Sequence, residues 1–339
     1  MKNVVNILKK HKKLIMLIGV PVVYLILALF LNNGTLGKYE YGLLMIAGIY
    51  IIMAESLNLT TGFLGQMVLG QAAFMSIGAF VSAICTLHMS LPQHIQFPVS
   101  ILMGGFFTAI AGTLIAIPAL KLKGGYLAVV TLAFVEIIQN LFQNMDITGR
   151  AIGLKNIMKF PMNSANYSST YGFTYVYWIT VIVLLVISRI IKSEHGRQII
   201  AIRDNQIAAQ AVGVNITRVK IKTFMLSAFF AGIAGGLYTH YMGTIYADKF
   251  SSTESFEMLV IVILGGMGNI TGAVIATLVV KWLPELLRSF SVYRTLIFGI
   301  VLVLITLYKN TAIKEAVNNR VSAVKRLILG KNSSDETSV

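Results

Sequence analysis

The chain has 339 residues, of which 56% are hydrophobic and only 12% are charged, and its formal net charge is +15. Soluble domains carry about a quarter charged residues, so this composition excludes an ordinary soluble protein and indicates a polytopic membrane protein. The single cysteine, Cys85, excludes an internal disulfide and a cysteine-rich metal site.

The lysine and arginine residues gather in three segments, 1–13, 192–222 and 309–339. These segments flank apolar runs, where the positive-inside rule places basic residues on the cytoplasmic side. The net charge is therefore interpreted as a topology signal, and no nucleic acid is expected as a partner. We expect a cytoplasmic basic arm at 1–13, a transmembrane domain at 14–308 and a cytoplasmic basic tail at 309–339.

Apolar runs of about the 20 residues that cross a bilayer recur along the chain. They are continuously apolar, which excludes the alternating pattern of an outer-membrane barrel. We expect an all-α fold of about ten crossings, with both termini in the cytoplasm if the broken element crosses twice or dips and returns. The expected spans lie near 14–31, 41–60, 64–86, 98–120, 125–144, 173–191 and 223–245, with a broken element at 256–287 and a last span at 292–308.

Two glycine-rich stretches interrupt the apolar pattern in opposite halves of the chain. Irregular backbone at membrane depth is tolerated only where it is buried in protein or lines a polar cavity. Two such breaks therefore predict a transport path, and close helix packing through small residues is the alternative. The candidate path residues in these stretches are Asn58, Gly62, Gln66, Gln71, Gly265, Gly266 and Gly268.

Glu136 is a carboxylate inside an apolar run. It begins a polar stripe at helical spacing that continues through Gln139, Asn140, Gln143 and Asn144. An intramembrane carboxylate normally faces the interior of the helix bundle, so we expect Glu136 to point inward. Two roles stay open for it, a place in the transport path or a structural hydrogen bond to neighbouring helices.

The segment 192–222 is nearly the only long polar stretch between the apolar runs. Its residues Ile200, Ile207, Ala211 and Val214 have the spacing of one helical face. This pattern predicts an amphipathic helix. The helix either docks onto another protein or lies in the lipid headgroup layer.

Motifs for catalysis are absent from the sequence. There is no phosphate-cradling Gly-x-x-x-x-Gly-Lys-Ser/Thr loop, no His-Glu-x-x-His and no Gly-x-Ser-x-Gly elbow. We therefore expect neither an enzyme nor a cofactor or metal bound by this chain.

Four stretches resemble the permease subunits of bacterial branched-chain amino-acid ABC importers of the LivM type. Two of them read Leu57-Asn-Leu-Thr-Thr-Gly62 and Val262-Ile-Leu-Gly-Gly-Met-Gly268. The four stretches occupy 56–79, 122–137, 196–237 and 262–272, in the order that the family has, over about residues 41–290. The resemblance implies a translocation path for branched-chain or related hydrophobic amino acids.

The resemblance also implies that 192–222 is a cytoplasmic coupling loop that docks onto a separate ATPase. Ile207 stands at the position of an acidic residue in the loop of the family. The residues that match the coupling motif are Arg203, Asp204, Ala208, Ala209 and Gly213.

The implied assembly lies in the bacterial cytoplasmic membrane. It contains a second, LivH-like permease subunit, two cytoplasmic ATPase subunits that bind the ATP, and an extracytoplasmic solute-binding protein. Gln71, Arg150 and Ala273 depart from the usual His, Thr-Gly-Gly and Pro of the family. Because of these departures, urea, short amides and nucleosides stay open as substrates. An ion-coupled secondary transporter that uses Glu136 is the competing class.

Overall fold

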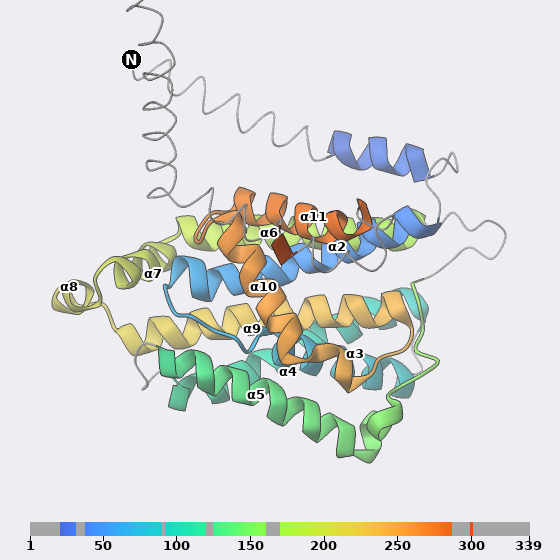
Figure 1. The fold of residues 1–339 in the computed structure, drawn as a ribbon, viewed down its shortest axis with the longest axis horizontal. Helices are drawn as coiled ribbons and strands as arrows, with labels where there is room; N and C mark the ends of the chain where they lie inside the picture. Colours follow the sequence, from blue (N-terminus) through green and yellow to red (C-terminus); the bar gives the residue numbers. More distant parts are fainter. Residues whose placement is uncertain are drawn as a thin grey trace, which may run out of the picture. The chain divides into compact units, whose positions relative to one another are not determined.

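The computed structural model describes residues 21–31, 38–89, 92–119, 125–160, 170–286 and 299–300. All regular elements in these ranges are helices (Figure 1), accompanied by one isolated antiparallel bridge between Leu154 and Ile245. The all-α prediction is confirmed. The chain divides into two units, Met1–Lys281 and Trp282–Val339, and the elements below are those of the first unit with the end of its last helix.

Six helices are long and apolar enough to cross a membrane, and Pro21–Leu31 and Ile270–Pro284 are shorter apolar helices. About ten crossings are not reached among the described residues, since most of the expected last span at 292–308 lies outside them. The helices are α2 (Lys38–Leu57), α3 (Gln71–His88), α4 (Gln93–Ala119), α5 (Gly125–Asn144), α6 (Thr170–Lys192), α7 (Glu194–Asp204), α8 (Gln206–Ala211), α9 (Ile216–Met242), α10 (Ser252–Gly265) and α11 (Ile270–Leu286), with the short turns η1 (Asn58–Phe63), η2 (Asp146–Thr148), η3 (Arg150–Ile152) and η4 (Ala247–Phe250).

The core is built on the spans that contain α2, α3 and α9, each 72% buried, whereas those of α5 and α6 are 28% and 22% buried. Small residues bring α3 and α9 together, because a Cβ at Gly78 would lie only 2.3 Å from Gly232 Cα. Lipid offers no hydrophobic drive for helix association, so close backbone approach of this kind holds membrane helices together. Packing therefore accounts for Gly78, at the end of the first glycine-rich stretch.

Two span boundaries differ from the sequence prediction. The span expected from residue 64 begins as helix only at Gln71, because Gly65 has φ +73° and interrupts the helix. The span expected from 223 begins at Ile216, because Asn215 caps α9 by accepting a hydrogen bond from Arg218 N at 3.0 Å. The first two turns of α9 therefore belong to the segment expected as a polar loop.

Candidate functional site

The first glycine-rich break lies directly after α2. The helix widens into one π-helical turn, η1, and all six of its residues are buried. Residues 64–70 then run without regular helix to the start of α3. Such π-turns inside helices are frequent at functional sites.

The second break separates α10 from α11. Gly266 and Gly268 have φ of +90° and +78°, a conformation that favours glycine. Asn269 starts α11, since its Oδ1 accepts from Gly272 N at 3.2 Å. The predicted broken element is thus two helices, with a turn at residues 266–269.

The two breaks contact each other. Asn58 Oδ1 accepts a hydrogen bond from Gly268 N at 2.9 Å, across 210 residues of sequence. A Cβ at Gly62 would lie 2.4 Å from Gly268 N, so only glycine fits this approach without movement of the backbone. The polar backbone of each break is therefore partly satisfied by the other, as a membrane interior requires.

Arg203, near the end of α7, reaches the same place. Its Nη1 donates to Gly62 O at 3.4 Å, and its Cγ lies 2.9 Å from the position of a Cβ at Gly65. Its Nη2 also lies 3.1 Å from Asp204 Oδ1. One residue predicted for coupling thus contacts residues predicted for the path, and we call Asn58, Gly62, Arg203 and Gly268 the junction.

Other predicted path residues lie outside the junction. Gln71 is fully buried and donates from Nε2 to Ser56 Oγ. Its Oε1 has no hydrogen-bond partner among the described residues. Gly265 packs within 1.9–2.9 Å of where a Cβ at Gly272 would sit, so it forms the corner between α10 and α11. Gln66 is half-buried beside Gly65, and its backbone N donates to Thr60 O at 3.0 Å.

The predicted single amphipathic helix of the coupling segment is wrong. The segment forms two helices, because Asn205 adopts extended backbone and its side chain caps α8 through Ile207 N and Ala208 N, both at 3.0 Å. Ile207 is 81% exposed instead of lying on a buried face. Of the residues matched to the coupling motif, Ala209 is buried, whereas Asp204, Ala208 and Gly213 are exposed.

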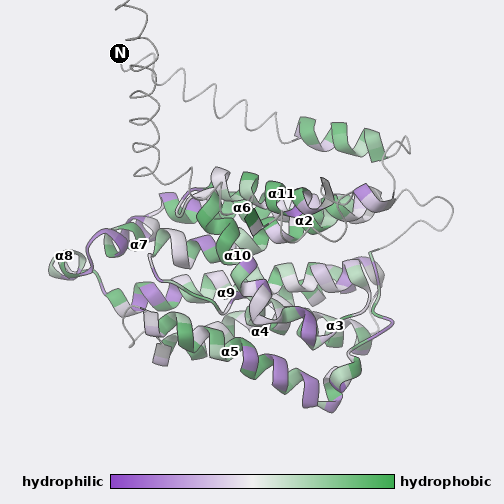
Figure 2. Ribbon diagram, viewed as in Figure 1, coloured by the Kyte–Doolittle hydropathy of each residue, from purple (hydrophilic) through white to green (hydrophobic). Residues whose placement is uncertain are grey.

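The expectation that Glu136 points inward is also wrong for this chain. Only Leu127, Ala128, Thr131 and Val135 of α5 are buried, and Glu136 lies on the exposed side. Hydrophilic residues run along the C-terminal half of α5 (Figure 2). The stripe divides because α5 lies at the edge of this chain: Glu136, Asn140 and Asn144 are exposed, and Gln139 and Gln143 contact Asp248.

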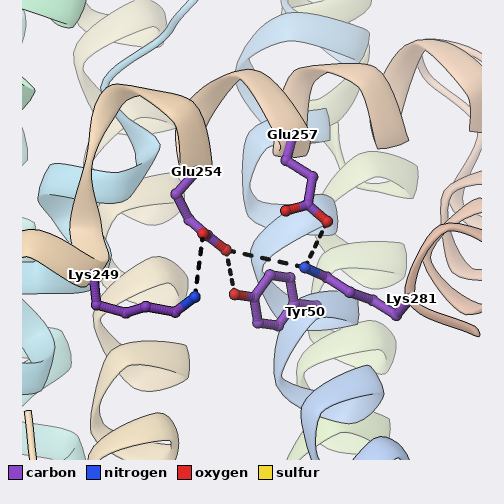
Figure 3. Close-up of polar contacts among 5 residues, drawn as sticks. All are labelled: Tyr50, Lys249, Glu254, Glu257 and Lys281. Atoms are coloured by element: carbon purple, nitrogen blue, oxygen red, sulfur yellow. Dashed lines mark hydrogen bonds and ion pairs between the residues drawn. The ribbon is translucent and has the colours of Figure 1, made fainter. Parts of the chain in front are cut away.

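An ionic cluster of five residues on α2, η4, α10 and α11 was not predicted from the sequence (Figure 3). Lys281 Nζ donates to Glu257 Oε1 at 2.7 Å and lies 4.0 Å from Glu254 Oε1. Lys281 Nζ also lies 3.4 Å from the centroid of the Tyr50 ring, and the Tyr50 hydroxyl donates to Glu254. Lys249 completes the cluster, with its Nζ 3.9 Å from Glu254 Oε2.

A sequence signal for the ionic cluster did exist. Glu254 and Glu257 have i, i+3 spacing in an apolar helix, and Lys281 is the one charged residue in the apolar run 270–284. Ionisable residues within membrane segments usually pair with each other. The two positive and two negative side chains balance, so the cluster ties α10 and α11 to α2.

Comparison with known proteins identifies the family of this chain. Residues 40–306 match the family described as "Branched-chain amino acid transport system / permease component". The "High-affinity branched-chain amino acid transport system permease protein LivM" of Escherichia coli (strain K12) is 32% identical over 77% of this chain and 66% of its own length. The protein of the same description from Salmonella typhimurium is also 32% identical, with the same coverage.

More distant relatives include a permease that is named for a different class of substrate. A "Probable branched-chain amino acid transport permease protein LivM" of Methanocaldococcus jannaschii is 26% identical over 77% of this chain and 89% of its own length. The "Ribose import permease protein RbsC" of Haemophilus influenzae is 25% identical, over 79% and 78%. No solved structure matches the chain.

The resemblance expected from the sequence is confirmed, and these relatives are transport permeases, not enzymes. The chain spans 66% of the length of each of the two enterobacterial relatives. Since the family match covers most of the chain, the protein is a multi-pass membrane protein that belongs to the permease components of branched-chain amino acid transport systems.

Proposed function

We propose that the chain is the membrane-spanning permease subunit of an ABC importer for branched-chain or related hydrophobic amino acids. The observation that carries the proposal is the junction, where Arg203 of the coupling segment contacts Gly62 of the first glycine-rich break, which itself packs against Gly268 of the second. In such an importer, a separate subunit hydrolyses ATP. The conformational change of that subunit has to be transmitted to the membrane helices. Arg203 supplies a direct polar contact from the coupling segment to Gly62, and Asn58 connects the first break to Gly268 of the second.

The substrate class rests on the relatives. Those at 32% identity are named for branched-chain amino acids, and a ribose permease follows at 25%. The partners that we propose are a second, LivH-like permease subunit, two cytoplasmic ATPase subunits and an extracytoplasmic solute-binding protein. The ATP belongs to the ATPase subunits, because the sequence has no P-loop.

The path residues divide into two groups in this proposal. Asn58, Gly62, Gln66, Gly266 and Gly268 form its cytoplasmic end, beside the coupling segment. Glu136, on the exposed side of α5, lines the part shared with the second permease subunit, since lipid is a poor solvent for a carboxylate. Gln71 and Gly265 support the lining from behind, because both are buried.

For the topology, we propose a basic arm at 1–13, a membrane domain at 14–308 with its coupling segment at 192–222, and a basic tail at 309–339. About ten crossings result when the six spans are counted with α10, α11 and the expected spans at 14–31 and 292–308. α10 has 14 residues, or about 21 Å, which is shorter than a 30 Å core, so α10 and α11 form a pair of short helices that crosses twice or dips and returns. Both termini and residues 192–222 are then cytoplasmic, as the positive-inside rule requires.

Single cysteines at Lys10 and Lys325, introduced after Cys85 has been replaced by serine, are expected to resist impermeant thiol reagents in intact cells. They should react after the cells are opened. Cysteine at Lys155 is the control, because the proposed order of crossings places residues 145–172 outside the cell, and it should react in intact cells. Ready labelling at Lys325 in intact cells would contradict the even number of crossings.

The variant Arg203→Gln tests the proposed coupling. It removes the guanidinium from Gly62 O, so ATP hydrolysis by the assembled complex is expected to continue while uptake of leucine falls at least about tenfold, the equivalent of one charge-assisted hydrogen bond. Arg197→Gln is the matched control. This arginine lies on the same helix, is 67% exposed, and has only a 4.0 Å contact with Glu194 as its ion pair.

The two activities are measured separately, as phosphate release and as uptake in proteoliposomes. Equal uptake by Arg203→Gln and Arg197→Gln would remove the junction from the coupling route. Uptake by this chain alone, driven by a proton gradient, would identify a secondary transporter instead.

A further inference from the structure

A cavity of about 410 Å³ lies where the start of α7, the start of α9 and the segment between α8 and α9 come together. His195 and Gln198 line it from α7, and Arg218 and Lys222 line it from α9. Each pair has i, i+3 or i, i+4 spacing, so each lies on one face of its helix. Residues 212–214 complete the lining with Asn215 and Val219.

The charge in this cavity is positive and unbalanced. None of the described residues that line it is acidic. The Arg218 guanidinium and the Lys222 ammonium form no ion pair within the described ranges, whereas the nearby Arg203 is paired with Asp204. A cavity with two unpaired cations indicates an anionic ligand.

His195 adds a second observation. Its Nε2 is buried and has no hydrogen-bond partner in the described part of the chain. Burial and the positive charge of Lys222 lower the pKa of His195, so the neutral ring is favoured while the cavity is empty. Its other charged neighbours are Arg218 across the cavity and Glu194 and Arg197 on its own helix. An anion in the cavity would offset the positive charge of Lys222 and so favour the protonated ring.

The position of the cavity along the membrane normal indicates which class of anion it binds. The span that contains α6 ends at Lys192, and the next begins at Ile216. The 27 residues of that span measure about 40 Å at 1.5 Å per residue, about 10 Å more than a 30 Å hydrocarbon core. Lys222 lies within about 9 Å of the start of the span, in this excess length outside the hydrocarbon core. This is the depth of the lipid headgroups, and basic pockets at the cytoplasmic ends of membrane helices suit anionic headgroups.

We propose that this cavity binds a phosphate group, and that the ligand is the phosphodiester of an anionic phospholipid of the cytoplasmic leaflet. The Arg218 fork hydrogen-bonds two phosphate oxygens, and Lys222 and protonated His195 supply further charge-assisted donors. A soluble phosphate has the same chemistry, and the NMR experiment below distinguishes it from a lipid. The inference requires that the chain spans a membrane, but not that it imports amino acids.

Lipid retention by the full-length chain in detergent micelles is the first test. Native mass spectrometry after titration with phosphatidylglycerol or phosphatidylcholine should show preferential retention of phosphatidylglycerol. The variant R218Q/K222Q is expected to bind phosphatidylglycerol about twenty-fivefold more weakly, at about fivefold for each basic residue removed. The charge-conserving variant R218K/K222R should keep most of the binding.

The variant K192Q/R197Q is the matched control, because it removes two basic residues from the same region that do not line the cavity. It should leave phosphatidylglycerol affinity unchanged. Equal losses in the two double variants, or no loss in R218Q/K222Q, would overturn the proposal. Normal lipid retention by R218Q/K222Q with loss of a co-purifying ATPase would also overturn it, and would make the cavity an ATPase contact.

Histidine NMR of the ¹⁵N-labelled full-length chain distinguishes the two phosphate sources. The His195 signal is the one lost in H195Q. Phosphatidylglycerol is expected to raise the pKa of His195, and inorganic phosphate at millimolar concentration is expected to leave it unchanged. A rise with inorganic phosphate and none with phosphatidylglycerol would overturn the lipid as ligand in favour of a soluble phosphate.

Discussion

Replacing Gly62 by alanine is expected to impair transport strongly. The new Cβ would lie 1.9 Å from Asn58 Oδ1 and 2.4 Å from Gly268 N. Gly268 N is a backbone atom, so relief requires the two breaks to move apart, and overpacking of this kind destabilises by about 1–3 kcal/mol. Leucine uptake by the reconstituted complex should fall by at least about tenfold, the effect of a 1.4 kcal/mol change.

Gly125→Ala is the control for this substitution, because no heavy atom lies within 4 Å of a Cβ built at Gly125. Gly125 is also the first residue of α5, where alanine is at least as good a helix former. It should insert, assemble and transport like the unchanged chain. If Gly62→Ala transports equally well, the close contact of the two breaks is not part of the working cycle.

Replacing Lys281 by methionine is expected to destabilise the chain strongly. Its side chain is 13% exposed and lies between Glu254 and Glu257, so its removal leaves two carboxylates close together in a region of low dielectric constant. Breaking a buried ion pair by removing one partner typically costs about 3–5 kcal/mol. Denaturant or thermal unfolding of the purified chain in micelles measures the loss.

Two further variants test whether the loss of stability comes from the ionic cluster. Arg150→Gln breaks the Arg150–Asp146 pair, whose side chains are 68% and 81% exposed, so a change below about 1 kcal/mol is expected. The double variant K281M/E257Q should recover part of the loss, because it removes the carboxylate that loses its ion pair with Lys281, whereas Glu254 keeps Lys249. Similar unfolding curves for Lys281→Met and Arg150→Gln would show that the ionic cluster does not hold α10 and α11 to α2.

Several features of this protein follow from local sequence and were predictable. Apolar length is a property of each segment, so the helical class and the positions of the six spans could be predicted to within several residues. Glycine disfavours continuous helix wherever it is concentrated, and the breaks after Asn58 and at Gly266–Asn269 occur where the glycines are. The motif order between residues 41 and 290 was sufficient for the family, because motifs are matched along the chain.

Other features depend on contacts between distant residues, and only the tertiary structure decided them. Asn58 meets Gly268 across 210 positions and Arg203 meets Gly62 across 141, and helical periodicity carries no information about such pairs. Periodicity also placed Glu136 on one face of α5 without saying whether that face lies inside this chain or at its edge. The packing of α2, α3 and α9 through small residues leaves α5 at the edge, and so decides that Glu136 is exposed.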